Sequence, residues 1–385
     1  MKRQAESHPG NKKKMQRSNE ELFHLIEPEY YYEGGLRYVR PYHFEYQTYA
    51  KERWLGRSIL DVFRREFRDR PASYYQMAIE KELIRINGGS CSLDHIVENS
   101  DLISHKLHRH EPPVLMDSLI PIVHFDGKLL VVDKPASLPV HPSGRYRFNT
   151  LVEIIKRQLK LDCKISPINR LDRLTSGICI LSTDPATAER LHGLMEGREE
   201  KVWFRKEYVA RVQGSFPEKA TCEAPLRVIE HKLGLVTVDY HSEKSKPSRT
   251  EFELISSDGQ HSIVRCRPIT GRTHQIRVHL LHLGFPIVND HLYNKPLWKE
   301  DLSGEEGEAR LKRIAKTLLD EAIEREPDLP NLTEDDAPCI ECLAIEKGLS
   351  RPIPKPEDMC IYLHAYRYSC PEWSYETAMP SWATL

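Results

Sequence analysis

Short apolar runs separated by turn residues fill the chain from about residue 115 onward, and they constrain its fold more than any other feature. Residues 129–132 and 178–181 have the length and composition of buried strands. Helical spacing appears only at intervals, as in residues 151–159 and 186–195. Because strands and helices do not alternate regularly, the sequence predicts an α+β domain with a mixed or antiparallel central sheet and flanking helices.

The first 52 residues differ from the rest of this 385-residue chain, which is long enough for two to three domains. Residues 1–27 are mainly polar, carry three consecutive lysines, and are interpreted as a disordered basic tail. Residues 28–52 contain eight aromatic side chains at irregular spacing. This spacing is atypical of a helix and predicts an extended arm that lies on a folded body.

Two short helices followed by a strand and a turn are predicted within residues 53–113. Ile59, Phe63 and Phe67 share one helical stripe, and Ser73 begins a second helix with the spacing of a capping box. The first helix displays three arginines on its other side, namely Arg64, Arg65 and Arg68. This arrangement resembles the S4-type RNA-binding module, which implies a small RNA-binding domain.

The net charge of −1 conceals one strongly acidic segment. Residues 299–336 hold 13 acidic and six basic residues, so the remainder of the chain has a net charge of +6. We interpret residues 299–350 as a helical acidic insertion within a major domain of residues 114–385. A basic body suits contact with a polyanion, although clustered charge is also typical of a solvated surface.

Cysteine use and hydropathy limit the cellular compartment. The chain has nine cysteines, an odd number, which argues against a disulfide framework and for a reducing compartment. It shows no N-terminal apolar segment and no apolar run of about 18 residues. The sequence therefore predicts a protein of the cytoplasm or nucleus that does not span a membrane.

Residues 169–177, Asn-Arg-Leu-Asp-Arg-Leu-Thr-Ser-Gly, place the carboxylate of Asp172 between Arg170 and Arg173. A flanking guanidinium keeps such a carboxylate ionised and oriented, as a nucleophile requires. The Thr-Ser-Gly end of the string suits a tight turn. Taken alone, Arg-x-Asp-Arg is more typical of ion pairs on a surface loop.

The whole string resembles the Arg-Leu-Asp-x-x-Thr-Ser-Gly signature of the RluA-like family of RNA pseudouridine synthases. Three further segments resemble that family's other motifs in the same order, namely residues 133–142, 206–214 and 270–290. The resemblance implies the pseudouridine synthase fold for residues 114–385. The aromatic arm and the S4-like region are similar to the eukaryotic subgroup that includes tRNA anticodon-loop synthases.

The resemblance implies that the protein isomerises uridine to pseudouridine in RNA, in the tRNA anticodon loop at position 32. Asp172 would be the central anion, whether it attacks C1′, adds to C6 or removes a ribose proton. Arg277 would pair with Asp172, and Tyr208 would stack on the extruded uracil. Arg170 would fill the gap that the flipped base leaves in the RNA.

Several residues of these motifs have a second interpretation. The resemblance implies RNA contact for Lys134, Lys206, Arg272 and His274. The two lysines are equally consistent with structural roles, and the other two residues with a solvated basic helix that contacts phosphate at most. By its two-residue period alone, Tyr208 would be a core tyrosine of a half-buried strand.

The chain departs from the family signature at Asn169, where a histidine usually precedes the arginine. Asparagine can still hold the loop through hydrogen bonds, but it cannot titrate near neutral pH. A role that needs an ionisable group at this position therefore does not transfer to this chain.

Two metal-based interpretations compete with this one. His241-Ser242-Glu243 and the Pro-Cys-Ile-Glu-Cys segment at residues 338–342 match the two halves of a zinc-dependent nucleobase deaminase. About a hundred residues separate the halves, which disfavours a compact deaminase site. A structural zinc ion held by Cys339, Cys342 and either Cys360 or Cys370 is the other interpretation, although a single Cys-x-x-Cys is weak and free thiols are the default.

The sequence thus predicts RNA as the partner of a monomeric enzyme. Transfer RNA is the first candidate and messenger RNA the second, with no metal and no small-molecule cofactor, because the isomerisation involves no redox change or external energy source. A catalytically inactive RNA-binding protein is the non-enzymatic alternative. The presence of Asp172 disfavours it.

Overall fold

The computed structural model describes residues 25–67, 72–116, 118–195, 203–231, 233–299, 304–324, 339, 341–342 and 354–385. The chain divides into a smaller unit, which holds residues 1–29 and 40–110, and a larger unit of residues 30–39 and 111–385. The predicted disordered tail lies outside the described residues except for residues 25–27. Within the described ranges, no helix is long and apolar enough to cross a membrane.

The smaller unit combines three antiparallel strands with two α-helices and the 3₁₀ helix η1 (Glu52–Trp54). The strands follow the order β3 (Tyr42–Tyr49), β5 (Leu102–Arg109) and β4 (Ile84–Ile86). The helices are α2 (Ile59–Glu66) and α3 (Ala72–Glu80), whose Phe63 and Tyr75 rings lie 5.2 Å apart in the core. Both predicted helices and the following strand are confirmed. Ser73, however, lies inside α3 and does not cap it.

Residues 28–52, predicted to be an extended arm, instead contribute three strands. β1 (Tyr30–Glu33) pairs with β2 (Leu36–Val39), which also pairs with β6 (Val114–Leu115) in the larger unit. Tyr31 and Tyr38 stack as cross-strand partners, with ring centroids 4.7 Å apart. The aromatic residues therefore stabilise strand pairing. An arm was predicted because the Gly34-Gly35 turn between β1 and β2 was overlooked, and because the partner of β3 lies far along the chain.

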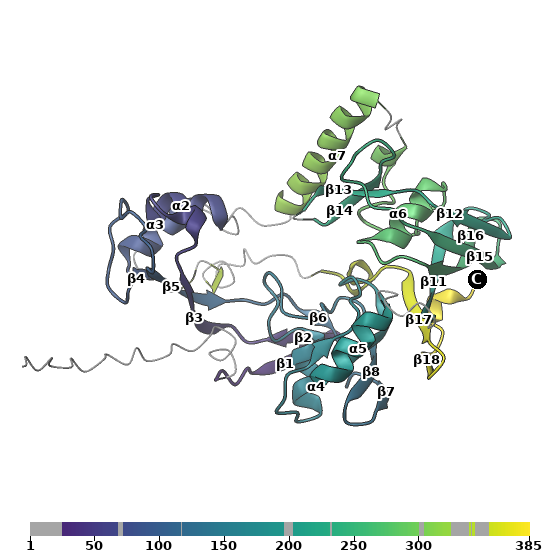
Figure 1. The fold of residues 1–385 in the computed structure, drawn as a ribbon, viewed down its shortest axis with the longest axis horizontal. Helices are drawn as coiled ribbons and strands as arrows, with labels where there is room; N and C mark the ends of the chain where they lie inside the picture. Colours follow the sequence, from purple (N-terminus) through teal and green to yellow (C-terminus); the bar gives the residue numbers. More distant parts are fainter. Residues whose placement is uncertain are drawn as a thin grey trace, which may run out of the picture. The chain divides into compact units, whose positions relative to one another are not determined.

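A ten-stranded sheet forms the centre of the larger unit (Figure 1). Its main path runs through β12 (Lys219–Cys222), β15 (Thr250–Ser257), β16 (His261–Pro268), β11 (Arg205–Gln213), β17 (Leu363–Ser369), β10 (Ser176–Ser182), β8 (Leu129–Lys134) and β7 (Ile122–Phe125). β18 (Ser374–Glu376) pairs with β17, and β9 (Ser166–Pro167) with β10. Only β10 and β17 pair in parallel, so the sheet is mixed, as predicted.

Helices cover both faces of this sheet because alternate residues of β8 and β10 point to opposite sides. Val132 and Leu181 pack with α4 (Leu151–Gln158) on one side. Val131 and Ile180 pack with α5 (Pro185–Met195) on the other. The predicted flanking helices and the predicted α+β class are thereby confirmed.

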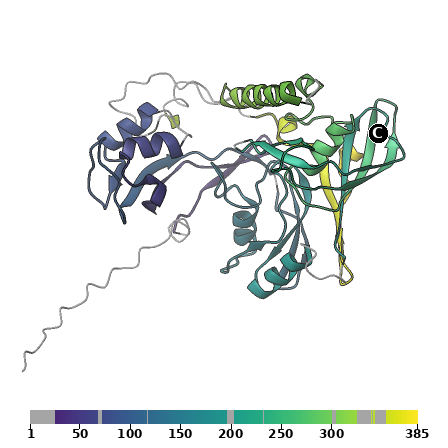
Figure 2. The same cartoon turned by 45° about the horizontal axis from the view of Figure 1, so that its top comes forward.

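A separate hairpin of β13 (Leu226–Glu230) and β14 (Leu235–Val238) lies beside two more helices (Figure 1 and Figure 2). These are α6 (Gln275–His282) and α7 (Gly304–Glu324), and short 3₁₀ turns η2 (Pro296–Trp298), η3 (Pro356–Met359) and η4 (Ser381–Ala383) follow α6 or α7 in the chain. α7 forms the helix expected within the acidic insertion. Its residues Leu311, Ile314 and Leu318 are buried with Val236 and Tyr293, so the insertion contributes to the core of the larger unit.

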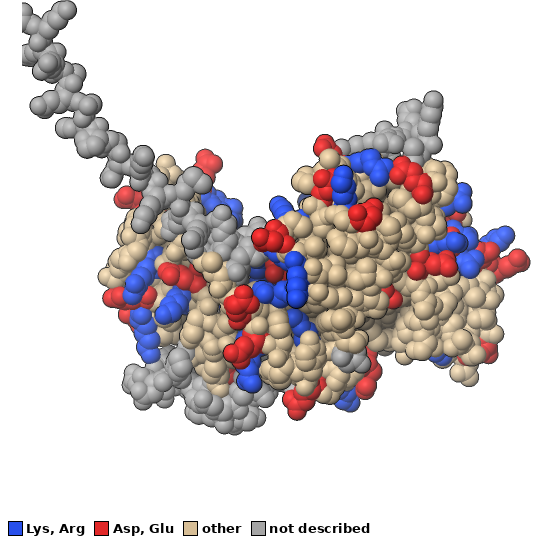
Figure 3. All heavy atoms as spheres, turned by 90° about the horizontal axis from the view of Figure 1, so that it is seen from below, with Lys and Arg blue, Asp and Glu red and all other residues tan. Residues whose placement is uncertain are grey.

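Charged residues of α7 form ion pairs with the body of the larger unit. Arg227 of β13 lies 2.6 Å from Glu308 of α7 and 2.7 Å from Asp239. On the face shown in Figure 3, basic and acidic side chains are intermixed. In the part of the acidic segment that the structure describes, negative charge therefore lies next to positive charge of the larger unit.

Gly177, the last residue of the Asp172 string, lies where the parallel strands β10 and β17 meet. Its φ is +109°, and a Cβ there would lie 2.3 Å from the Ala365 carbonyl oxygen. Gly177→Ala is therefore expected to lower the free energy of unfolding by about 2 kcal/mol, from backbone strain and a clash. Gly127→Ala is the matched control for urea unfolding, since Gly127 also has positive φ (+93°) but nothing within 4 Å. Equal losses in the two variants would contradict the close approach.

Candidate active site

The loop that carries Asp172 connects β9 with β10 and is held by a lysine of β8. Lys134 Nζ donates hydrogen bonds to the carbonyls of Pro135 and Leu138, each at 2.9 Å. It also donates to the carbonyl of Arg173 at 3.3 Å. An ammonium has three donors, so these carbonyls occupy all of them and join β8 to the loop.

The predicted RNA contact of Lys134 is therefore corrected to an internal role. Its side chain is completely buried, because the last residue of β8 points into the interior. Burial lowers the pKa of Lys134 to about 7. An enclosed ammonium that is already bonded to three carbonyls has no donor left for a phosphate.

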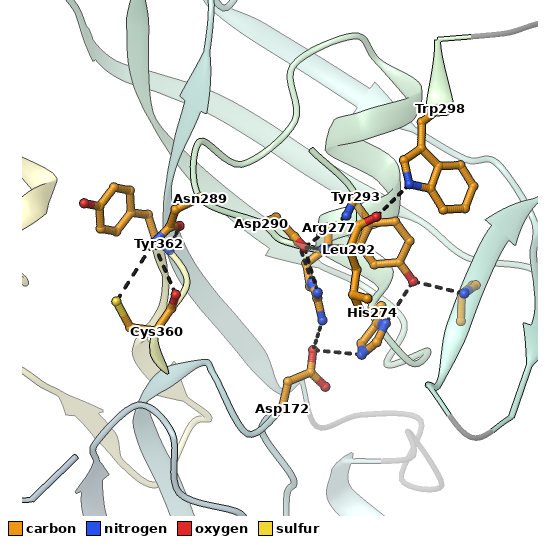
Figure 4. Close-up of polar contacts among 11 residues, drawn as sticks. Asp172, His274, Arg277, Asn289, Asp290, Leu292, Tyr293, Trp298, Cys360 and Tyr362 are labelled. Atoms are coloured by element: carbon orange, nitrogen blue, oxygen red, sulfur yellow. Dashed lines mark hydrogen bonds and ion pairs between the residues drawn. The ribbon is translucent and has the colours of Figure 1, made fainter. Parts of the chain in front are cut away.

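Arg277 lies between Asp172 and Asp290, and the Asp290 carboxylate is fully buried (Figure 4). Its Nη1 lies 3.3 Å from Asp172 Oδ2, which is the pairing that the resemblance implies. Its Nε and Nη2 donate to the two carboxylate oxygens of Asp290 at 2.6 and 2.8 Å. A bidentate pair of this kind fixes the plane of the guanidinium. Arg277 therefore presents its remaining nitrogen to Asp172 in a defined direction.

Asp290 is a site residue that the sequence analysis missed. Burial disfavours its charged form, but Arg277 and the backbone N–H groups of Leu292 and Tyr293 outweigh burial and lower the pKa of Asp290. Burial likewise opposes the charge of Arg277, but Asp290 and Asp172 raise the pKa of that guanidinium. Asp290 ends the segment 270–290 that resembles a family motif, but no local pattern shows that its partner is Arg277, 13 residues earlier in the chain.

His274 approaches Asp172 from another direction. Its Nε2 lies 3.6 Å from Asp172 Oδ2, and its Nδ1 lies 2.9 Å from the Tyr293 hydroxyl. That hydroxyl accepts a hydrogen bond from the Val236 backbone N–H at 3.0 Å, so its own hydrogen is available for Nδ1. Burial lowers the pKa of His274 to about 4. His274 is thus enclosed and neutral, and it does not lie on a solvated helix face.

Tyr208 is a core residue of its strand, as the two-residue period indicates, and stacking on an extruded uracil stays a prediction. It packs in the sheet core with Ala210 and Val212, and it also lines the pocket that contains Asp172. Its hydroxyl forms a hydrogen bond with the Tyr368 hydroxyl, and Asn169 Nδ2 donates to the Tyr368 oxygen at 3.3 Å. The sequence analysis did not single out Tyr368, which pairs with the strand of Tyr208 only through the fold.

One pocket of about 630 Å³ is lined by Asp172, Tyr208, His274 and Arg277. This volume is typical of sites for small molecules or single nucleotides. Asp172 is one-third exposed there (33%), so it is accessible and is not buried among apolar side chains. Three basic residues also line the pocket, namely Arg170, Lys206 and Arg272. Arg170 and Arg272 are exposed, while Lys206 is half-buried and burial lowers its pKa. The pocket therefore combines the oriented carboxylate of Asp172 with positively charged side chains in its wall.

Two of the arginines expected to bind RNA in the smaller unit, Arg64 and Arg65, lie on α2. Arg64 is exposed, and Arg65 is exposed but donates to Asp61 at 2.8 Å. Arg68 lies outside the described residues.

The described residues do not assemble the two metal sites with the ligand sets that the sequence suggested, although the thiols of Cys339 and Cys342 lie within 4.8 Å of each other. His241 and Glu243 are exposed on a loop, and among the described residues His241 joins no cluster of metal-ligating side chains. Neither Cys360 nor Cys370 supplies a ligand to the Cys339–Cys342 pair. Cys360 instead lies beside Asn289, and Cys370 is buried in the core of the larger unit.

Comparison with known proteins adds independent information. Residues 128–282 match the family model described as RNA pseudouridylate synthase, and this span contains both Asp172 and Arg277. The "tRNA pseudouridine(32) synthase, mitochondrial" of Saccharomyces cerevisiae is 41% identical, covering 95% of this chain and 81% of the relative. Human "Pseudouridylate synthase RPUSD2" is 38% identical over 94% of this chain and 76% of the relative. The yeast "tRNA pseudouridine(31) synthase" is 32% identical over 93% and 98%.

The predicted cytoplasmic or nuclear location is contradicted by the first of these relatives, which is named mitochondrial. Free thiols indicate only a reducing compartment, and they do not distinguish one such compartment from another. An apolar N-terminal segment is typical of secretory signals, whereas transit peptides are amphipathic and basic, so hydropathy does not distinguish a mitochondrial from a cytoplasmic location.

The matched relatives cover nearly the whole chain, and the matched family model covers the pocket with its paired carboxylate and guanidinium. The likeness therefore extends over the part of the chain that carries Asp172 and Arg277. This chain belongs to the RNA pseudouridine synthase family, whose members are isomerases.

Proposed function

We propose that this protein converts uridine to pseudouridine in the anticodon loop of tRNA, at position 32. The observation that carries the chemistry is the accessible Asp172 carboxylate held by Arg277 in the pocket. The choice of position rests on the yeast relative named for position 32, which is more similar to this chain than the relative named for position 31. Messenger RNA is the alternative substrate.

Asp172 is the proposed catalytic residue. The reaction breaks the bond from ribose C1′ to N1 of uracil, rotates the detached base and joins C5 to C1′. C5 then loses its proton and N1 gains one, so the product is an isomer of uridine. An anionic carboxylate assists by attacking C1′, by adding to C6 or by removing a ribose proton. Arg277 and His274 both face Asp172 Oδ2, so they orient the carboxylate for any of these routes.

The target uracil must leave the RNA stack to reach Asp172. Base flipping costs a few kcal/mol, and less when the nucleotide already lies in a loop. Arg170 is exposed beside the pocket and is proposed to occupy the gap that the base leaves. Tyr208 is proposed to contact the extruded ring, since base stacking on an aromatic side chain contributes about 1–3 kcal/mol.

RNA affinity is proposed to come from basic residues outside the carboxylate pair. Lys206 and Arg272 line the pocket and are placed to meet phosphates near the flipped nucleotide. Residues 53–113 are proposed to act as an S4-like RNA-binding domain, because they form two helices and a small sheet with Arg64 exposed. Arg65 and Arg68 belong to the same proposed surface.

The isomerisation needs no oxidant, reductant or energy source, so we propose that the protein acts without a cofactor. We also propose that it acts as a monomer. A catalytically inactive RNA-binding protein would need neither an accessible carboxylate nor two groups that orient it. The Asp172 geometry therefore favours the enzyme over this alternative.

Anticodon stem-loop RNAs with single uridines test the substrate. The protein is incubated with RNAs that carry uridine at position 32 only, at position 31 only, or at neither, and pseudouridine is mapped by chemical modification and primer extension. We expect product from the RNA with uridine 32 and none from the other two. Product confined to position 31 would overturn the proposed position, and binding of all RNAs without product would favour the inactive RNA-binding protein.

A further inference from the structure

A buried chain of polar groups holds the hydroxyl of Tyr208. Tyr208 lies on β11 and Tyr368 on the neighbouring strand β17, and their hydroxyl oxygens form a hydrogen bond. Asn169, three residues before Asp172, donates from Nδ2 to the Tyr368 oxygen. Tyr368 is 1% exposed, so no solvent competes for its hydroxyl. All three of these side chains line the pocket that contains Asp172.

The backbone determines which atom of the Asn169 amide faces Tyr368. Asn169 Oδ1 accepts a hydrogen bond of 2.7 Å from the Ile180 backbone N–H. The flipped amide would set two N–H donors against each other, so this bond fixes the side-chain orientation. Nδ2 therefore faces Tyr368, and an amide nitrogen can only donate.

The direction of the hydrogen bond between the Tyr368 and Tyr208 hydroxyls follows because each buried hydroxyl hydrogen needs an acceptor. The Tyr368 oxygen accepts from Asn169, so its own hydrogen needs an acceptor, and the Tyr208 oxygen is its remaining hydrogen-bond partner in the described structure. If Tyr208 donated instead, the buried hydrogen of Tyr368 would have no acceptor, an unfavourable state. The Tyr208 oxygen therefore accepts, and its own hydrogen is directed away from Tyr368.

We infer that Asn169 and Tyr368 are positioning residues that hold Tyr208 as a hydrogen-bond donor toward the flipped uracil. This inference rests on the proposed function. Burial raises the pKa of both phenols, which keeps them protonated at neutral pH. A neutral phenol whose oxygen already accepts a hydrogen bond is a donor rather than a base. Tyr208 would thus fix the orientation of the detached uracil and would not remove its C5 proton.

Tyr368→Phe tests this inference, because it removes one oxygen and retains the ring. Single-turnover rates are expected to fall about tenfold, as for the loss of one hydrogen bond in the transition state, with RNA affinity unchanged. Tyr362→Phe is the matched control, since Tyr362 immediately precedes the same strand and its ring stacks on Trp382. In Figure 4 its hydroxyl points away from Asp172. We expect this control to react at the wild-type rate.

A double-mutant cycle separates positioning from a merely structural role. Tyr208→Phe is expected to lower the rate about 10²-fold, as for the loss of a preorganised donor. Tyr368→Phe should then have no further effect in the Tyr208→Phe background, because the two residues act through one hydroxyl. Multiplied rate losses, or a Tyr368→Phe variant as fast as the control, would overturn the inference alone. A wild-type protein without product would refute the proposed function, and the inference would fall with it.

Discussion

Replacing Asp172 with asparagine is expected to abolish pseudouridine formation while leaving RNA affinity nearly unchanged. The substitution keeps the shape of the side chain and an oxygen that can accept from Arg277 Nη1, now 3.3 Å from Oδ2. It removes the negative charge that each of the three routes requires, so turnover should fall by more than about 10⁴-fold. Affinity should stay within about threefold, because it comes mainly from phosphate contacts spread over the surface.

Two measurements on the same preparation check this expectation. Single-turnover formation of pseudouridine reports catalysis, and fluorescence anisotropy with labelled RNA reports binding. Asp162→Asn is the matched control, because Asp162 is exposed and precedes Asp172 by ten residues. Retained turnover in Asp172→Asn would show that another group supplies the anion. A large loss of affinity would show that Asp172 contributes mainly to RNA binding.

Much of the fold could be predicted because its elements follow local periodicity. The alternation in β8 and β10 and the helical stripe of α4 each lie within one short segment, so composition and spacing suffice. β3 was missed because its partner lies far along the chain, whereas β1 and β2 form a hairpin around the two-residue turn Gly34-Gly35, a local signal that was overlooked. β3 pairs with β5 about 60 residues later. Strand pairing at that separation leaves no local pattern.

The residues of the active site also divide into those that a local pattern reveals and those that only the tertiary structure reveals. Asp172 and Arg277 could be predicted because they stand in recognisable strings, although 105 residues separate them. The roles of Asp290, Tyr293 and Tyr368 were missed, although Asp290 stands in the same string as Arg277, because these residues act on the others only through the tertiary structure. Lys134 illustrates the converse error, since a lysine in an RNA-binding protein suggests phosphate contact until its burial is known. Residue type predicts the chemistry of a site better than it predicts which groups orient it.

Replacing Asp290 with asparagine is expected to destabilise the larger unit more than any surface substitution. The guanidinium of Arg277 is 4% exposed, and the variant would leave it buried without its bidentate partner. Loss of one partner of a buried ion pair lowers the free energy of unfolding by about 3 kcal/mol or more. Urea unfolding measures this difference. Asp320→Asn, at an exposed position of α7, is the control and should change stability by less than about 0.5 kcal/mol.

The pH dependence and a double variant distinguish this ion pair from a general packing effect. The pKa of Asp290 is lowered in the folded protein, so its stabilising effect is present above the unfolded pKa of about 3.9 and is lost as pH falls through the folded pKa. The stability difference between wild type and Asp290→Asn should therefore shrink only below about pH 4.

Arg277→Met combined with Asp290→Leu should recover stability, because apolar pairs often replace buried ion pairs without loss. It should not recover turnover, since Asp172 would lack its guanidinium. An Asp290→Asn variant as stable as the control would contradict the assigned role of Asp290.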